Sequence, residues 1–288
     1  MCFHSLPKRR RAISNNPKLC VTLSRQNAHL LRVNCTVTAI ASLDFCIIRC
    51  HRKKNVINDF KLVTVLIMDI AQNLHHLKSS LPAHVALVAV SKFHSVSELQ
   101  QAYDAGQKIF GENRVQELVA KYPLLPSDIQ WHFIGTLQTN KVKYIIPFID
   151  TIQSVDSLRL LTEIEKQVTQ LNRRIRVLLE VHIAEETTKH GFEPDECLHL
   201  FVENKLDVYP HVVVAGLMGM ATFTDDTKQV DREFKRLKGL FDEIKRSGRA
   251  SDSFTELSMG MSDDYPIAIR NGSTMIRVGT MLFGERNR

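Results

Sequence analysis

The residue with the clearest chemical potential is Lys92, which follows the apolar run VALVAVS at residues 85–91. A lysine in that position is expected to be partly desolvated, and desolvation lowers the pKa of its amine. A neutral amine can form a Schiff base with an aldehyde. The alternative is a solvated lysine that bends outward, because lysine is rarely fully buried without a partner.

Two loops of small residues could bind a phosphate group. One is SMGMS at residues 258–262, and the other is VGT at residues 278–280. Hydroxyl groups and glycines permit close approach of an anion, and N–H groups at a helix start near Asp263 would favour it. Ordinary tight turns are the alternative. A phosphate site and a Schiff-base lysine together point to pyridoxal 5′-phosphate (PLP).

Arg277 lies inside a predicted strand, where a charge requires a partner. It could face a ligand or form an ion pair with a strand carboxylate such as Glu180, and the sequence leaves both open. The chain contains no HExxH, P-loop, GxSxG or CxxC motif, so no metal site is predicted.

These residues must be positioned by the elements from residue 68 onward, where apolar runs alternate with segments of helical periodicity. Strands are predicted at 85–91, 108–111, 131–135, 151–155, 176–183, 212–220, 256–259 and 274–279. Helices are predicted at 68–81, 95–106, 113–122, 137–146, 193–206, 226–246 and 263–271, with another that Asp156 would cap.

Regular alternation implies parallel strands with crossover helices, so the predicted fold class is α/β, a single (β/α)8 TIM-type barrel. An open doubly wound sheet is the alternative, but it lacks its usual GxGxxG marker. Active sites of such barrels lie at the carboxyl ends of the strands, which would bring Lys92 and both loops to one mouth.

Composition is that of a globular protein, with 288 residues, 44% hydrophobic and 24% charged. No run of about eighteen apolar residues occurs, so a membrane span is not expected. The net charge of +7 arises from residues 1–67, which hold 12 Lys or Arg and 2 Asp or Glu. The remainder is mildly acidic, so nucleic-acid binding could be argued only for the first 67 residues.

Two parts are therefore predicted: residues 1–67, a basic extension, and residues 68–288, the barrel. The extension holds five of the six cysteines and has no clear period. We expect it to be disordered or to lie upstream of the true translation start, which would be Met68. A transit peptide or a basic arm for nucleic acid or membrane is the alternative. The cysteines form no evident disulfide framework, so a reducing compartment, the cytoplasm, is expected.

Several motifs resemble the pyridoxal phosphate homeostasis protein family, in the family's order across residues 68–288. They are VAVSK (88–92), FGEN (110–113), HFIGTLQTNK (132–141), KHGF (189–192), GLMGM (216–220), LSMGMSDD (257–264) and STMIRVGTMLFGER (273–286). Residues 1–67 are not covered by the resemblance.

The resemblance implies a barrel related to the N-terminal domain of alanine racemase, with PLP held by Lys92 as a Schiff base. It implies that Ser258, Gly279 and Thr280 hold the phosphate, and that Arg277 faces the pyridine nitrogen. Asn113 would lie near the cofactor ring, with Met218 and His132 as further contacts.

We therefore predict a PLP-binding protein that takes part in intracellular vitamin B6 homeostasis without robust catalysis, and no catalytic residue is assigned. A permanently charged arginine disfavours protonation of the pyridine nitrogen, and little sequence follows the last strand to supply an opposing base. The alternative is a PLP-dependent, racemase-like enzyme; an arginine alone does not exclude it, since the related racemases also use one. Nucleic-acid binding by residues 1–67 is the lowest-ranked of the three functions.

The expected partners are PLP and PLP-dependent apo-enzymes. The chain is expected to be a monomer.

Overall fold

The computed structural model describes residues 35–37, 48–50, 69–185 and 190–284. The chain divides into two units, Met1–Leu66 and Ile67–Arg288. In the first unit, β1 (Cys35–Val37) pairs antiparallel with β2 (Ile48–Cys50). The predictions of disorder across residues 1–67 and of a start at Met68 otherwise lie outside the described residues.

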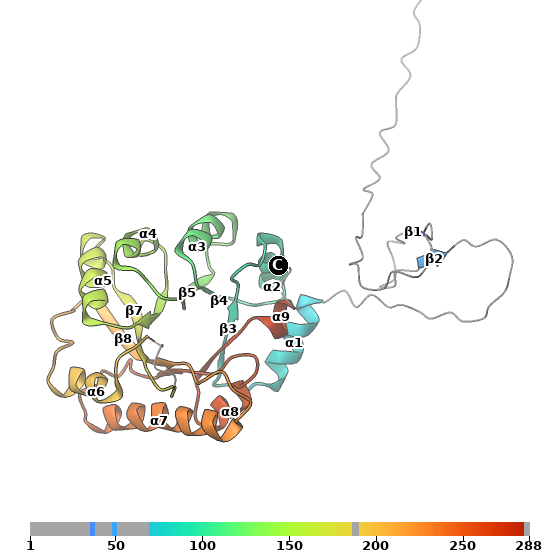
Figure 1. Cartoon of the computed structure of the whole chain (residues 1–288). Coiled ribbons are helices and arrows are strands. Elements are labelled where there is room, and N and C mark those ends of the chain that lie inside the picture. The colour runs from blue at the N-terminus through green and yellow to red at the C-terminus, as the bar shows by residue number, and fades with distance from the viewer. Residues whose placement is uncertain (1–34, 38–47, 51–68, 186–189, 285–288) are drawn as a thin grey trace, which may run out of the picture. The chain divides into compact units, whose positions relative to one another are not determined.

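The second unit is a closed barrel of eight parallel strands, which confirms the predicted (β/α)8 fold (Figure 1). The strands follow one another around the barrel in chain order, and β10 closes it by pairing with β3. They are β3 (Ala86–Val90), β4 (Ile109–Glu112), β5 (Gln130–Phe133), β6 (Thr151–Val155), β7 (Ile175–Val181), β8 (Val212–Gly219), β9 (Glu256–Ser258) and β10 (Met275–Val278).

Helices connect the strands and cover the outside of the barrel, as Figure 1 shows. They are α1 (Ile70–Ser80), α2 (Val96–Asp104), α3 (Val115–Lys121), α4 (Val142–Ile145), α5 (Leu158–Gln170), α6 (Pro194–Val202), α7 (Thr227–Arg246), α8 (Tyr265–Arg270) and α9 (Thr280–Phe283). Short 3₁₀ turns lie at Tyr122–Leu124 and Thr139–Lys141. The helix predicted at 137–146 is therefore wrong in length, because its first half forms a turn.

Side-chain caps explain where several helices begin. Asp69 accepts hydrogen bonds from the backbone N–H groups of the first turn of α1. Ser95 and Glu98 form a reciprocal capping box on α2. The predicted cap at Asp156 is off by one residue, because Ser157 caps α5 by accepting from the N–H of Leu160.

The main core lies between the strands and the surrounding helices. Apolar side chains on one face of α5 and of α7 are buried there, including Leu161, Ile164, Phe234 and Leu237, whereas Leu171 at the end of α5 is exposed. A second, smaller cluster contains only residues of β7 and β8, namely Leu178, Ala215 and Met218. No helix among the described residues is long and apolar enough to cross a membrane.

Candidate functional site

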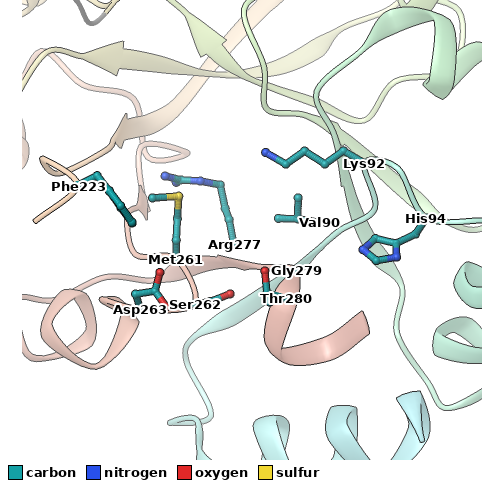
Figure 2. Close-up of a pocket in the computed structure, with 10 residues that line it drawn as sticks. All are labelled: Val90, Lys92, His94, Phe223, Met261, Ser262, Asp263, Arg277, Gly279 and Thr280. Carbon is teal, nitrogen blue, oxygen red and sulfur yellow. The ribbon is translucent and has the colours of Figure 1, made fainter. Parts of the chain in front are cut away.

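Lys92 lies two residues after the end of β3 and lines a pocket of about 170 Å³. Its side chain is partly buried, as the sequence predicts. In Figure 2 the amine end points across the pocket toward the guanidinium of Arg277. The side chain of Lys92 therefore extends from the end of a barrel strand into the pocket.

Four of the predicted site residues line this pocket together: Lys92, Arg277, Gly279 and Thr280. Both small-residue loops contribute, because Met261, Ser262 and Asp263 also line it. Ser262, Gly279 and Thr280 all belong to the lining drawn in Figure 2. Val90, His94 and Phe223 complete the lining and were not singled out from the sequence.

Close packing at Gly279 explains the residue type at this position. A Cβ atom there would lie 3.2 Å from both the Cβ and the carbonyl oxygen of Val90. The glycine therefore lets β10 approach β3 where the pocket opens. The helix predicted to begin near Asp263 is α8, and the favourable effect of its first N–H groups on an anion stays a prediction.

Arg277 is buried with 4% of its surface exposed, and its guanidinium makes two hydrogen bonds. Nη1 donates to Ser258 Oγ at 2.6 Å, and Nη2 donates to the carbonyl oxygen of Gly219 at 3.0 Å. Burial lowers the pKa of Arg277 to about 10, against the opposing effect of Asp264 and Glu180. The arginine thus remains charged at neutral pH and faces the pocket, without a direct ion pair to Glu180.

A buried polar network continues from Arg277 through the barrel. Ser258 Oγ donates to Gln153 Oε1 at 2.6 Å, and Nε2 of Gln153 lies 2.7 Å from Nδ1 of His132. Nε2 of His132 lies 3.6 Å from Asp150. Burial lowers the pKa of His132, so the ring is neutral and accepts from Gln153.

Ser258, Asn113 and Met218 do not line the pocket. Ser258 is fully buried beneath Arg277, and Met218 lies in the apolar cluster of the barrel interior. Asn113 follows β4, and its side-chain oxygen is buried without a hydrogen-bond partner among the described residues. Their contacts with a cofactor remain predictions.

Glu180 is a second buried charge near the mouth, at the end of β7. Burial and the nearby carboxylate of Asp156 raise its pKa to about 7, and the charge of Arg277 opposes this shift. The described residues contain no group of His, Cys, Asp and Glu side chains that could hold a metal ion.

The residues present fit a PLP molecule. A primary amine, a buried guanidinium and a cradle of small and hydroxyl residues surround one pocket, which matches the aldehyde, the ring nitrogen and the phosphate of that molecule. Asp263 is the carboxylate that lines the same pocket.

The fold and the site define a barrel of the alanine racemase N-terminal type, and the sequence model "Alanine racemase, N-terminal domain" matches residues 67–287. A pyridoxal phosphate homeostasis protein of Aquifex aeolicus is 42% identical over 201 residues, which cover 69% of this chain and 86% of the relative. The protein of that name in Schizosaccharomyces pombe is 35% identical over 206 residues, covering 70% and 85%. The chain belongs to the pyridoxal phosphate homeostasis protein family.

Solved structures agree with this assignment. PipY of Synechococcus elongatus with PLP bound has a TM-score of 0.68 and 36% identity, covering 75% of this chain and all of PipY. PipY without PLP has a TM-score of 0.70 and 37% identity with the same coverage. An alanine racemase of Clostridium difficile has a TM-score of 0.62 at 15% identity and covers 77% of this chain and 57% of the racemase, which is a likeness of fold alone.

Proposed function

We propose that this chain binds PLP through a Schiff base on Lys92 and takes part in vitamin B6 homeostasis. The observation that carries the proposal is the convergence of Lys92, Arg277, Gly279 and Thr280 on one pocket. The names of the relatives and the PLP-bound PipY structure support it. When bound, PLP supplies an aldehyde that reacts reversibly with amines.

Each residue would then have a defined part. Lys92 provides the amine, while Gly279, Thr280 and Ser262 surround the phosphate. Arg277 faces the pyridine nitrogen, held in place by Ser258 and Gly219. The earlier assignment of Ser258 to the phosphate stays untested, and Ser262 is the hydroxyl of that loop that lines the pocket. Asn113 is proposed to lie near the ring, with Met218, which packs with Leu178 and Ala215, as a further contact.

We further propose that the protein holds PLP without robust turnover. A guanidinium that remains charged at neutral pH opposes protonation of the pyridine nitrogen, which weakens the ring as an electron sink. The competing function, an amino-acid racemase, is supported by likeness of fold alone. The same proposal includes PLP-dependent apo-enzymes as recipients of the cofactor. It also includes a monomeric state and a cytoplasmic location.

Borohydride reduction of the full-length protein with PLP, followed by intact mass and peptide mapping, tests the proposal. We expect one pyridoxyl phosphate adduct on Lys92 and none on that peptide in Lys92→Ala. An unmodified Lys92 in excess PLP would refute the proposed binding mode. Conversion of L- to D-amino acids that is lost in Lys92→Ala would favour the racemase.

A further inference from the structure

Two ionic side chains of α3 hold the backbone on either side of Lys92. Nζ of Lys121 donates to the carbonyl oxygen of Ser91 at 2.8 Å. The carboxylate of Glu117 accepts from the backbone N–H of Phe93 at 2.9 Å. Lys92 therefore lies between two backbone groups that are both bound to the same helix.

The ammonium of Lys121 has a full set of acceptors. It also donates to Glu112 Oε1 at 2.5 Å and to Glu117 Oε2 at 3.3 Å. Glu112 in turn accepts from the hydroxyl of Ser91 at 2.8 Å. A lysine has three N–H donors, so all of them have partners within this cluster.

Burial of this cluster is unusual for charged side chains. The side chain of Lys121 is 10% exposed, and that of Glu112 is fully buried. Buried ion pairs often add little to stability compared with apolar residues of similar size. Their position against the turn at 91–93 suggests a role other than packing.

The backbone of the turn itself requires support. Phe93 has a φ of 67°, a left-handed conformation that a phenylalanine rarely adopts. Such conformations persist where the surroundings hold them, and they gather at functional sites. The N–H bound by Glu117 belongs to this residue.

We propose that Lys121 and Glu117 are positioning residues for Lys92, which fix the 91–93 turn so that the amine reaches the pocket. The inference rests on the proposed function. In the step concerned, Lys92 Nζ forms a C=N bond with the aldehyde carbon of PLP and one water leaves. Displacement of the turn would slow this step while leaving non-covalent binding of the phosphate and ring intact.

The test compares Schiff-base formation with non-covalent binding in full-length variants. The rate of the visible absorbance change on addition of PLP is measured, and the adduct is mapped after borohydride reduction. Affinity for pyridoxine 5′-phosphate, which has an alcohol in place of the aldehyde, reports the pocket alone. The variants are Lys121→Met, Glu117→Ala and Lys121→Arg, and Lys78→Met is the matched control, because Lys78 also donates to a backbone carbonyl, that of Gly106.

We expect Lys121→Met and Glu117→Ala to slow the reaction at Lys92 about tenfold or more, because each removes the charge-assisted hydrogen bond that holds one side of the 91–93 turn. Lys121→Arg should recover most of the rate, and Lys78→Met should match the wild type. Affinity for pyridoxine 5′-phosphate should stay within about twofold in all of them. If Lys121→Met fails to fold because Glu112 is left unpaired, Glu117→Ala decides, since its side chain is part-exposed.

Folded variants that react at the wild-type rate would overturn the inference, as would an equal loss of pyridoxine 5′-phosphate affinity. Failure of the proposed function gives a different result, because the wild type itself would then form no adduct on Lys92.

Discussion

The hydroxyl of Ser258 joins Arg277 to the interior of the barrel. It accepts from Nη1 of Arg277 at 2.6 Å and donates to Oε1 of Gln153 at 2.6 Å. Both the arginine and the serine are buried, so neither can exchange its partner for water. The orientation of the guanidinium at the pocket thus depends on a side chain one strand away.

Replacement of Ser258 by alanine tests this dependence. The change leaves Nη1 of Arg277 and Oε1 of Gln153 without their partner, and we expect a loss of about 1–3 kcal/mol in the free energy of unfolding. PLP affinity should fall as well, because the guanidinium is no longer fixed. Urea unfolding and PLP titration measure the two effects. Ser253→Ala, which removes an exposed hydroxyl, is the control, and equal stability of the two variants would contradict the prediction.

A methyl group at residue 279 should disturb the pocket. In Gly279→Ala the new Cβ would lie 3.2 Å from the backbone oxygen of Val90, so β3 or β10 must shift. We expect a loss of about 1–3 kcal/mol in stability, as for other overpacked sites, with weaker PLP binding.

The matched control is Gly239→Ala in α7, where the added Cβ meets no atom within 4 Å. That change should stabilise the helix by up to about 1 kcal/mol, because alanine favours helices over glycine. Thermal unfolding and PLP titration distinguish the variants. If Gly279→Ala and Gly239→Ala bind PLP with equal affinity, close packing at residue 279 does not affect the pocket.

The loop that carries Phe223 depends on Glu233 of α7. Its carboxylate accepts from the backbone N–H of Thr222 at 2.6 Å, from the Thr222 hydroxyl at 2.7 Å and from the N–H of Glu185 at 3.0 Å. Glu233→Ala should lower the free energy of unfolding by about 1.5–3 kcal/mol and weaken PLP binding, because the loop lines the pocket. Glu243→Ala, on the exposed face of the same helix, should change neither urea unfolding nor titration. If both variants behave alike, the loop does not depend on this carboxylate.

The barrel could be predicted because local patterns determine it. Apolar strands alternate with helices, and only parallel strands with crossover helices accommodate that order. Lys92, Gly279 and Thr280 could also be placed, because carboxyl ends of strands meet at one mouth. Helix ends could be predicted less well than the strands. The predicted cap at Asp156 lies one residue before the observed cap at Ser157, which offers an equally suitable side chain.

Contacts across the barrel could not be predicted. Gln153 has no local feature that links it to Ser258, which lies 105 residues further along the chain. Lys121 and Glu117 have a spacing typical of a solvated helix face, and only the folded chain brings them to the turn at Lys92. Such contacts depend on strand register and the twist of the barrel, which no short segment encodes.

Glu180 should make the stability of the ligand-free protein depend on pH. Burial and the carboxylate of Asp156 raise its pKa from 4.5 to about 7, so the folded state binds the proton more tightly than the unfolded state. The contribution is fully present below about pH 4.5 and is lost as pH rises through about 7, which amounts to about 3 kcal/mol. Urea unfolding over this range should show the decline in the wild type relative to Glu180→Gln, which cannot titrate. Asp156→Asn should shift the decline to lower pH, because one source of the raised pKa is removed. If the free energy of unfolding depends on pH in the same way in the wild type and in Glu180→Gln, burial does not raise the pKa of Glu180.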